Sequence, residues 1–136
     1  MAADLSLSLR QLVAERAGYR CEYCLLPQAA SLHRHEPDHI VPRQHDGETR
    51  EDNLAFACLR CNRCKGPNVG SFDPLTGALV PLFNPRKQKW EDHFKWDGAM
   101  IEALSPEGRV TVKLLRLNDT DRVSERQRLV AVGLFM

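Results

Sequence analysis

The sequence predicts an α+β fold held together by two pairs of closely spaced cysteines. Helical periodicity occurs near both ends of the chain, over residues 5–17 and after Ser105, whereas the middle combines short strand-like runs with many turn residues. Two Cys-x-x-Cys pairs flank the first strand-like region, and their members are Cys21, Cys24, Cys58 and Cys61. Together these observations favour short helices and strands over a single repeated element.

Length and composition are those of a soluble globular protein. The chain has 136 residues, and we expect one domain spanning residues 1–136. Its net charge is only +1, from 19 Lys and Arg against 18 Asp and Glu, so the chain as a whole is not a polycation. No apolar run approaches the roughly 20 residues of a membrane helix. The N-terminus also lacks the basic start and continuous apolar stretch of a signal peptide. The sequence therefore predicts a cytoplasmic protein without a membrane partner, and it does not indicate an oligomeric state.

The N-terminal segment is expected to form a helix followed by a strand. Leucines at helical spacing predict a helix over residues 5–17, which Gly18 ends. Residues 32–41 are expected to form a strand. Pro37 is an irregularity in it, because proline lacks the amide donor that a central strand uses.

The central segment is expected to contain a loop, a short strand and a short helix. Residues 42–51 form a polar loop, and residues 52–59 enter a short strand or turn. Residues 62–65 open a short helix that Gly66 and Pro67 end.

The C-terminal half is expected to begin with an extended arm and end with two helices. Residues 68–89 are rich in Gly, Pro and Asn, and residues 90–104 suit a pair of strands. Ser105 and Pro106 are a helix-start signal, with serine as the cap and proline at the first position. A last helix over residues 119–132 is expected to turn Val123, Leu129 and Val130 inward.

The cysteine pairs predict a structural zinc site. Two residues between ligands let both sulfurs of a pair reach one tetrahedral ion from a single turn, and four thiolates suit Zn²⁺. In a chain without an export signal, this spacing favours a metal site over disulfides. One ambiguity stays open, because Cys64 forms an equally spaced pair with Cys61. We prefer Cys58 as the ligand, which leaves Cys64 as a free thiol.

A second group of polar residues predicts a different metal. Asp38 and His39 are adjacent, and Asn62 lies just after the second cysteine pair. Carboxylate and amide oxygens are the ligands that Mg²⁺ prefers, and Mg²⁺ keeps several waters of its own. A histidine with a pKa near about 6.5 can take a proton from water. This combination suits the hydrolysis of a phosphodiester bond, which requires an activated water and charge neutralisation at the phosphate.

The residues from about 19 to 68 resemble the HNH endonucleases, also called ββα-metal nucleases, and in particular small stand-alone bacterial members with a four-cysteine zinc site. The resemblance rests on separated elements in family order: Asp38-His39-Ile40-Val41-Pro42, Gly47, Asn53-Leu54, Cys58-Leu59-Arg60-Cys61-Asn62 and Lys65-Gly66. It implies a zinc-stabilised ββα-metal core at about residues 19–68. Flanking helices and a small C-terminal strand and helix extension, at about residues 69–136, would complete the fold.

The resemblance also implies a role for each matching residue. His39 would be the general base, and Asn53 would brace the loop and orient that base. Asp38 and Asn62 would hold the catalytic Mg²⁺ or Mn²⁺; many family members have a histidine at the second of these positions. If Asn62 is not a ligand, the second ligand has to be sought near His33 and His35. The basic residues around the motif would contact DNA, and these are Lys65, Arg63 and Arg60.

These observations predict a metal-dependent endonuclease that hydrolyses DNA. The alternative is a zinc-ribbon module that binds nucleic acid without cutting it. A cleavage assay with a His39→Ala control separates the two hypotheses.

Overall fold

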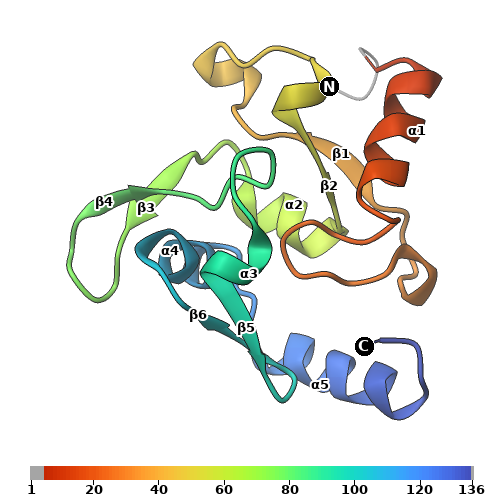
Figure 1. Ribbon diagram of the computed structural model, residues 1–136, viewed down its shortest axis with the longest axis vertical. Coiled ribbons are helices and arrows are strands. Elements are labelled where there is room, and N and C mark those ends of the chain that lie inside the picture. Colours follow the sequence, from red (N-terminus) through yellow and green to blue (C-terminus); the bar gives the residue numbers. More distant parts are fainter. Residues whose placement is uncertain (1–4, 136) are drawn as a thin grey trace. The chain divides into compact units, whose positions relative to one another are not determined.

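The computed structural model describes residues 5–135 (Figure 1). Short helices and three two-stranded antiparallel sheets make up these described residues, which confirms the α+β class. The chain divides into two compact units, here called unit 1 (residues 1–69) and unit 2 (residues 70–136). The expectation of one domain over residues 1–136 stays a prediction; Met1–Asp4 and Met136 lie outside the described residues.

Unit 1 begins with helix α1, which matches the predicted N-terminal helix. The helix spans Leu7–Arg16, and Ser6 caps it by accepting a hydrogen bond from the Leu9 N–H. Gly18 follows in the left-handed region with φ +62°, which glycine adopts without a steric penalty. The buried face of α1 packs in a small core cluster against strand β2; its fully buried members are Val13, Ala14, Leu54 and Phe56.

The centre of unit 1 is a strand–strand–helix arrangement. Strand β1 (Glu36–His39) pairs antiparallel with β2 (Leu54–Ala57), and α2 (Leu59–Lys65) follows β2. Strand β1 is shorter than the predicted strand over residues 32–41. Pro37 lies within β1, where it is tolerated because β1 has one strand partner and therefore needs few amide donors. The connection between the strands carries the short 3-10 turns η3 (Arg43–His45) and η4 (Glu51–Asn53), and a third such turn, η2 (Gln28–Ala30), precedes β1.

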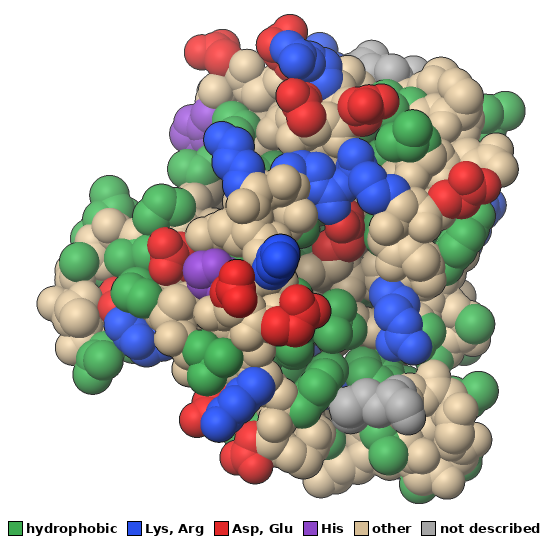
Figure 2. Space-filling view, in the orientation of Figure 1, with side chains coloured by type: hydrophobic (Ala, Val, Ile, Leu, Met, Phe, Trp, Pro, Cys, Tyr) green, Lys and Arg blue, Asp and Glu red, His purple; other side chains and the backbone are tan. Residues whose placement is uncertain are grey.

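Unit 2 begins with a hairpin where the sequence predicted an extended arm. Strand β3 (Gly70–Phe72) pairs antiparallel with β4 (Leu79–Pro81). The many Gly and Pro residues hid this pairing, because they dilute strand propensity while still permitting a short ladder. Figure 2 shows hydrophobic side chains over this hairpin at the left of the view. Phe72 and Leu79 face each other across the strands and are 62% and 71% exposed.

The predicted strand pair of residues 90–104 is present, preceded by a short helix. Helix α3 (Trp90–His93) leads into β5 (Phe94–Asp97), which pairs antiparallel with β6 (Met100–Ala103). Aromatic rings are packed beside this sheet at centroid distances of 5.1 to 5.6 Å, and they belong to Phe83, Trp90, Phe94, Trp96 and Phe135. Both tryptophans of the chain therefore contribute to unit 2 packing.

Two helices complete unit 2, and the second corrects a sequence expectation. Helix α4 (Pro106–Leu114) begins as predicted, because Ser105 Oγ accepts a hydrogen bond from the Gly108 N–H. Helix α5 (Thr120–Ala131) buries Arg122 and Arg126, whereas Val130 is 42% exposed. The expectation that Val130 turns inward was wrong. The buried arginines donate hydrogen bonds to backbone carbonyls just after α4. Leaving these carbonyls without donors would cost more free energy than one further apolar contact would gain.

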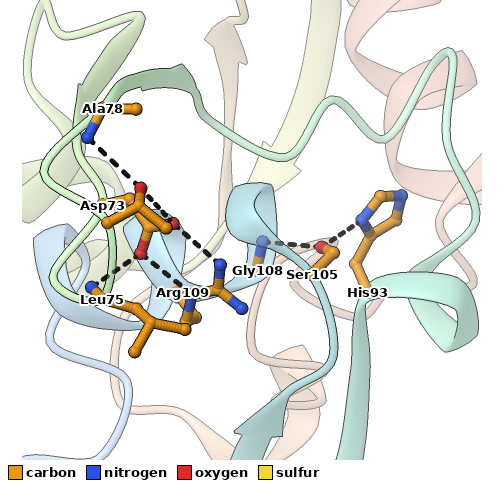
Figure 3. A network of polar contacts seen from close by, with 8 residues as sticks. Asp73, Leu75, Ala78, His93, Ser105, Gly108 and Arg109 are labelled. Atoms are coloured by element: carbon orange, nitrogen blue, oxygen red, sulfur yellow. Dashed lines mark hydrogen bonds and ion pairs between the residues drawn. The ribbon is translucent and has the colours of Figure 1, made fainter.

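A partly buried ion pair connects the hairpin of unit 2 to α4 (Figure 3). Arg109 donates from Nε and Nη2 to the two carboxylate oxygens of Asp73, at 2.9 and 2.8 Å. The Asp73 carboxylate also accepts from the Leu75 N–H. The Arg109 guanidinium holds the pKa of Asp73 well below its usual range. Nearby, His93 Nδ1 lies 2.6 Å from Ser105 Oγ (Figure 3).

Among residues 5–135, no helix combines the length and the apolar character that crossing a membrane requires.

Candidate active site and metal centre

The four cysteines that the sequence pairs come together in unit 1. All four sulfur atoms lie within 4.8 Å of one another, and all four side chains are buried. Cys24 Sγ and Cys58 Sγ are 3.7 Å apart. A tetrahedral zinc with Zn–S bonds of about 2.3 Å places its sulfurs about 3.8 Å apart. The cluster is therefore compatible with zinc stabilisation of the fold.

Each cysteine pair has the backbone turn that a metal knuckle needs. The Cys24 N–H points to Cys21 Sγ at 3.5 Å, and the Cys61 N–H points to Cys58 Sγ at 3.4 Å. Burial raises the pKa of the Cys21 and Cys61 thiols well above the usual range. A cation is needed to hold several thiolates in such a place, and zinc binding reverses the effect of burial by stabilising the deprotonated sulfurs.

The structure resolves the choice between Cys58 and Cys64. Cys58 belongs to the cluster, whereas Cys64 lies on α2, is partly exposed and is not among the clustered thiols. Cys58 also caps the N-terminus of α2, where its sulfur accepts from the Cys61 N–H. The position of Cys64 agrees with its expected state as a free thiol.

The predicted catalytic residues lie on β1, in the turn η4 and on α2. Asp38 and His39 occupy the end of β1, and His39 pairs in register with Leu54 of β2. Because neighbouring residues on a strand point to opposite faces, their two side chains serve different surroundings. His39 is 3% exposed. Burial lowers the pKa of its imidazole, and the nearby Asp38 carboxylate only partly offsets this effect.

A threonine that sequence analysis did not identify contacts the His39 ring. His39 Nε2 lies 2.8 Å from Thr49 Oγ1. No partner of the other ring nitrogen, Nδ1, is found among residues 5–135. Thr49 is ten residues away in the polar loop, so no local motif marks it. Only the path of the loop back to β1 brings the hydroxyl to the ring.

Asn53 fastens the same loop from its other end. Its Oδ1 accepts from the Val41 N–H at 2.9 Å, and its Nδ2 donates to the carbonyls of Val41 and Glu48 at 3.0 and 2.8 Å. Gly47 lies at the closest approach of this loop, where a Cβ atom would collide with the backbone of Val41. These contacts are those expected of a bracing residue. The amide of Asn53 is fully used by backbone groups.

The carboxylate of Asp38 is largely buried beside an unexpected partner. Lys65 Nζ lies 3.1 Å from Asp38 Oδ2 and donates a 2.9 Å hydrogen bond to the backbone carbonyl of His39. The contact with Asp38 is an ion pair without hydrogen-bond geometry, so Oδ2 is a buried oxygen that lacks a hydrogen bond. Burial raises the pKa of the Asp38 carboxyl, and the Lys65 ammonium opposes this change.

This burial changes the interpretation of Lys65. The sequence predicted a contact between its amine and a DNA phosphate, but its side chain is only 2% exposed and turns toward β1. A phosphate could reach the amine only after the side chain moved. Arg60 and Arg63, the other two residues predicted to contact DNA, also lie on α2, and Arg63 is exposed.

Asn62 is placed by its position on α2. It precedes Lys65 by three residues, so both side chains leave the helix on the same face. That face is directed toward β1, as the contact between Lys65 and His39 demonstrates. Asn62 is partly buried there. An amide oxygen and the Asp38 carboxylate are a donor set that suits a hard cation, and the Oδ2 atom without a hydrogen bond also fits such a group.

The reserve ligands His33 and His35 lie before β1. His35 is buried, and its Nε2 lies 2.8 Å from the Leu26 carbonyl. Its ring packs on Phe56 at a centroid distance of 5.3 Å. These contacts give His35 a place in the packing of unit 1. His33 is exposed.

Comparison with known proteins identifies one family. Residues 21–68 match the family model described as HNH endonuclease. No curated protein and no solved structure matches the chain. The matched segment contains both cysteine pairs, the β1–β2 strands and α2, and the family that it matches consists of nucleases. Residues 21–68 of this chain are thus similar to the HNH endonuclease family.

Proposed function

We propose that the protein is a metal-dependent endonuclease that hydrolyses DNA phosphodiester bonds, with His39 as general base. The observation that carries the proposal is the end of β1. A buried imidazole with one nitrogen fixed by Thr49 lies there, and the preceding residue, Asp38, has a buried carboxylate oxygen that lacks a hydrogen bond. A general base needs such a fixed ring with one nitrogen left for water.

The protein side of the reaction is proton transfer and orientation. If the Nε2–H of His39 donates to the Thr49 hydroxyl, Nδ1 carries the lone pair that accepts a proton from water. Because burial lowers the pKa of this imidazole, the ring is neutral and ready to accept a proton at neutral pH. Asn53 keeps the loop that carries Thr49 in place through its three backbone hydrogen bonds.

The second requirement is a divalent cation held by Asp38 and Asn62. When bound, Mg²⁺ or Mn²⁺ would neutralise charge on the phosphate and stabilise the leaving oxygen. Arg60 and Arg63 on α2 would contact the DNA backbone, since guanidinium groups bind phosphate oxygens in pairs. The four-cysteine site would hold structural Zn²⁺, which leaves no open position for a catalytic water.

The decisive experiment is a magnesium-dependent cleavage assay on supercoiled, linear and single-stranded DNA. His39→Ala should lower the rate by about 10² to 10⁴, the usual contribution of a positioned base. His45→Ala is the matched control, because His45 is an exposed histidine of the same loop region. If His39→Ala cuts at the wild-type rate, His39 is not the base.

A companion variant tests Asn62 as a ligand. Asn62→His would supply the imidazole that many family members have at this position, and it should shift the metal preference toward Co²⁺ and Ni²⁺. Rates are compared in Mg²⁺, Mn²⁺, Co²⁺ and Ni²⁺. An Asn62→Ala protein with an unchanged rate and metal profile would remove Asn62 from the ligand set.

The alternative function is a zinc-stabilised module that binds nucleic acid without cutting it. It predicts that neither the wild-type protein nor His39→Ala cleaves DNA in any of these metals and that both bind DNA equally. The buried and ordered surroundings of His39 favour the nuclease, because a binding module has no need for a histidine fixed in this way.

A further inference from the structure

The ammonium of Lys65 lies where the predicted metal ligand Asp38 would meet its cation. Nζ is 3.1 Å from Asp38 Oδ2 and 2.9 Å from the His39 carbonyl oxygen. The Lys65 side chain is 2% exposed, so its ammonium has exchanged most of its water for these oxygens. Lysine is rarely buried to this degree unless its charge is paired.

The charges at this position add to zero before any metal binds. Asp38 is negative, Lys65 is positive, and the other predicted ligand, Asn62, is uncharged. A divalent cation that approaches Oδ2 therefore meets an ammonium already beside the same oxygen. Repulsion between two cations is strong in a poorly hydrated site, where the effective dielectric constant is low.

The two contacts of Lys65 differ in a way that permits exchange. The bond to the His39 carbonyl has hydrogen-bond geometry, whereas the contact with Asp38 is electrostatic and leaves Oδ2 without a hydrogen bond. The ammonium is therefore anchored by the backbone of β1. Releasing the carboxylate therefore costs the ammonium no hydrogen bond.

We propose that Lys65 is a built-in counter-cation that occupies Asp38 in the DNA-free protein and must release it before a divalent cation binds. This inference rests on the proposed function, because it takes Asp38 as a ligand of the catalytic cation. The consequence is weak metal binding in the absence of DNA. The negative phosphate of DNA supplies the charge that lets the metal and the ammonium coexist.

The first test measures Mn²⁺ binding to the DNA-free, zinc-loaded full chain by electron paramagnetic resonance. Lys65→Met removes the charge and keeps the length of the side chain, and it should bind Mn²⁺ at least about tenfold more tightly than wild type. Lys65→Arg keeps the charge and should bind like wild type. Asp38→Asn gives the background from other sites. Titration at pH 8 favours the ionised form of the Asp38 carboxyl, whose pKa is raised by burial.

A second variant protects this test against a folding failure. Lys65→Gln retains a donor for the His39 carbonyl without the charge, and it should also bind Mn²⁺ more tightly than wild type. Neutral variants that fold and bind Mn²⁺ no better than wild type would overturn the proposal.

The second test follows the amine itself in the wild-type protein. Acetic anhydride labelling, read by mass spectrometry, should leave Lys65 protected without divalent cation and label it increasingly as Mn²⁺ fills the site. Lys113, exposed on α4, serves as the internal control. A site that fills with Mn²⁺ while Lys65 stays protected contradicts displacement.

Parallel cleavage assays separate this inference from the proposed function. If Lys65→Met binds Mn²⁺ more tightly but the wild-type protein cuts no DNA, the counter-cation proposal stands and the nuclease proposal is overturned. If wild type cleaves DNA and the neutral variants bind Mn²⁺ no more tightly than wild type, the nuclease proposal stands and the counter-cation proposal is overturned.

Discussion

The two units of the chain differ in how some of their buried polar groups are satisfied. In unit 2, Arg126 donates to the Ala99 and Leu117 carbonyls, and Asp73 shares two hydrogen bonds with Arg109. In unit 1, Asp38 Oδ2 is buried without a hydrogen bond, and the four clustered thiols lie together with raised pKa values at Cys21 and Cys61. Buried polar atoms that a fold leaves unsatisfied need an explanation, and a bound cation is one.

The four buried thiols are compatible with zinc stabilisation of unit 1, whereas the buried Asp73 and Arg126 of unit 2 are satisfied by protein partners. The sequence provides separate reporters for the two units, because both tryptophans, Trp90 and Trp96, lie in unit 2 and both tyrosines, Tyr19 and Tyr23, lie in unit 1. Tryptophan fluorescence therefore reports the unfolding of unit 2. Amide hydrogen exchange, read residue by residue, reports the unfolding of unit 1.

The largest expected effect is the loss of unit 1 on removal of zinc. Structural zinc contributes on the order of 10–16 kcal/mol in small zinc-dependent modules, more than most domains have in total stability. A strong chelator, or Cys61→Ser, should release one zinc per chain and abolish amide protection in β1, β2 and α2. Tryptophan fluorescence of unit 2 should change little.

Cys64→Ser is the control for this experiment. Because Cys64 lies outside the cluster, the Cys64→Ser protein should retain its zinc. A fully folded wild-type protein without zinc would contradict the structural metal. Joint loss of protection in both units would instead support the prediction of a single cooperative domain over residues 1–136.

The next effect is on unit 2 and requires no metal. Arg126→Met keeps an apolar side chain over Trp96 but leaves the Ala99 and Leu117 carbonyls without their donor. Losing charge-assisted hydrogen bonds in a buried site should lower the free energy of unfolding by about 2–4 kcal/mol. Urea unfolding followed by tryptophan fluorescence measures this change. Arg128→Met, at an exposed position on the same helix, should change it by less than about 0.5 kcal/mol.

A smaller effect separates positioning from stability in unit 1. Thr49→Val removes the hydroxyl 2.8 Å from His39 Nε2 while it keeps the shape of the side chain. We expect the cleavage rate to fall roughly fivefold with zinc content unchanged, because one hydrogen bond contributes about 1 kcal/mol. Thr49→Ser should restore most of the rate. A Thr49→Val protein with wild-type kinetics would show that the hydroxyl does not orient the base.

The smallest effect is the acid sensitivity of the Asp73–Arg109 pair. The pKa of Asp73 is lower in the folded protein than in the unfolded chain. At a pH between these two pKa values, the unfolded chain therefore binds more protons than the folded protein does. The pair therefore stabilises unit 2 above about pH 4 and loses this contribution as the pH falls through the folded pKa. Asp73→Asn should reduce the dependence of the urea midpoint on pH between pH 5 and pH 3. Asp92→Asn, at an exposed position, should leave this dependence unchanged.

Local chemistry made several features predictable from sequence. Cysteine spacing identified the four clustered thiols, because two residues between ligands already fix the turn that brings both sulfurs to one point. Ser105 and Pro106 identified the start of α4, because a serine cap acts within its own turn. The matched family segment and the α+β class follow from such local patterns.

Contacts between distant residues were decided only by the tertiary structure. The β3–β4 hairpin, the inward arginines of α5 and the contact of Thr49 with His39 each join residues whose sequence spacing carries no pattern. Lys65 is the sharpest case. Its sequence position suggested a solvent-exposed cation that contacts phosphate. In the structure its amine is buried and donates a hydrogen bond to the backbone carbonyl of His39, 26 residues earlier in the chain. Side-chain charge can be known from sequence, whereas the partner that satisfies it depends on which backbone groups the fold brings within reach.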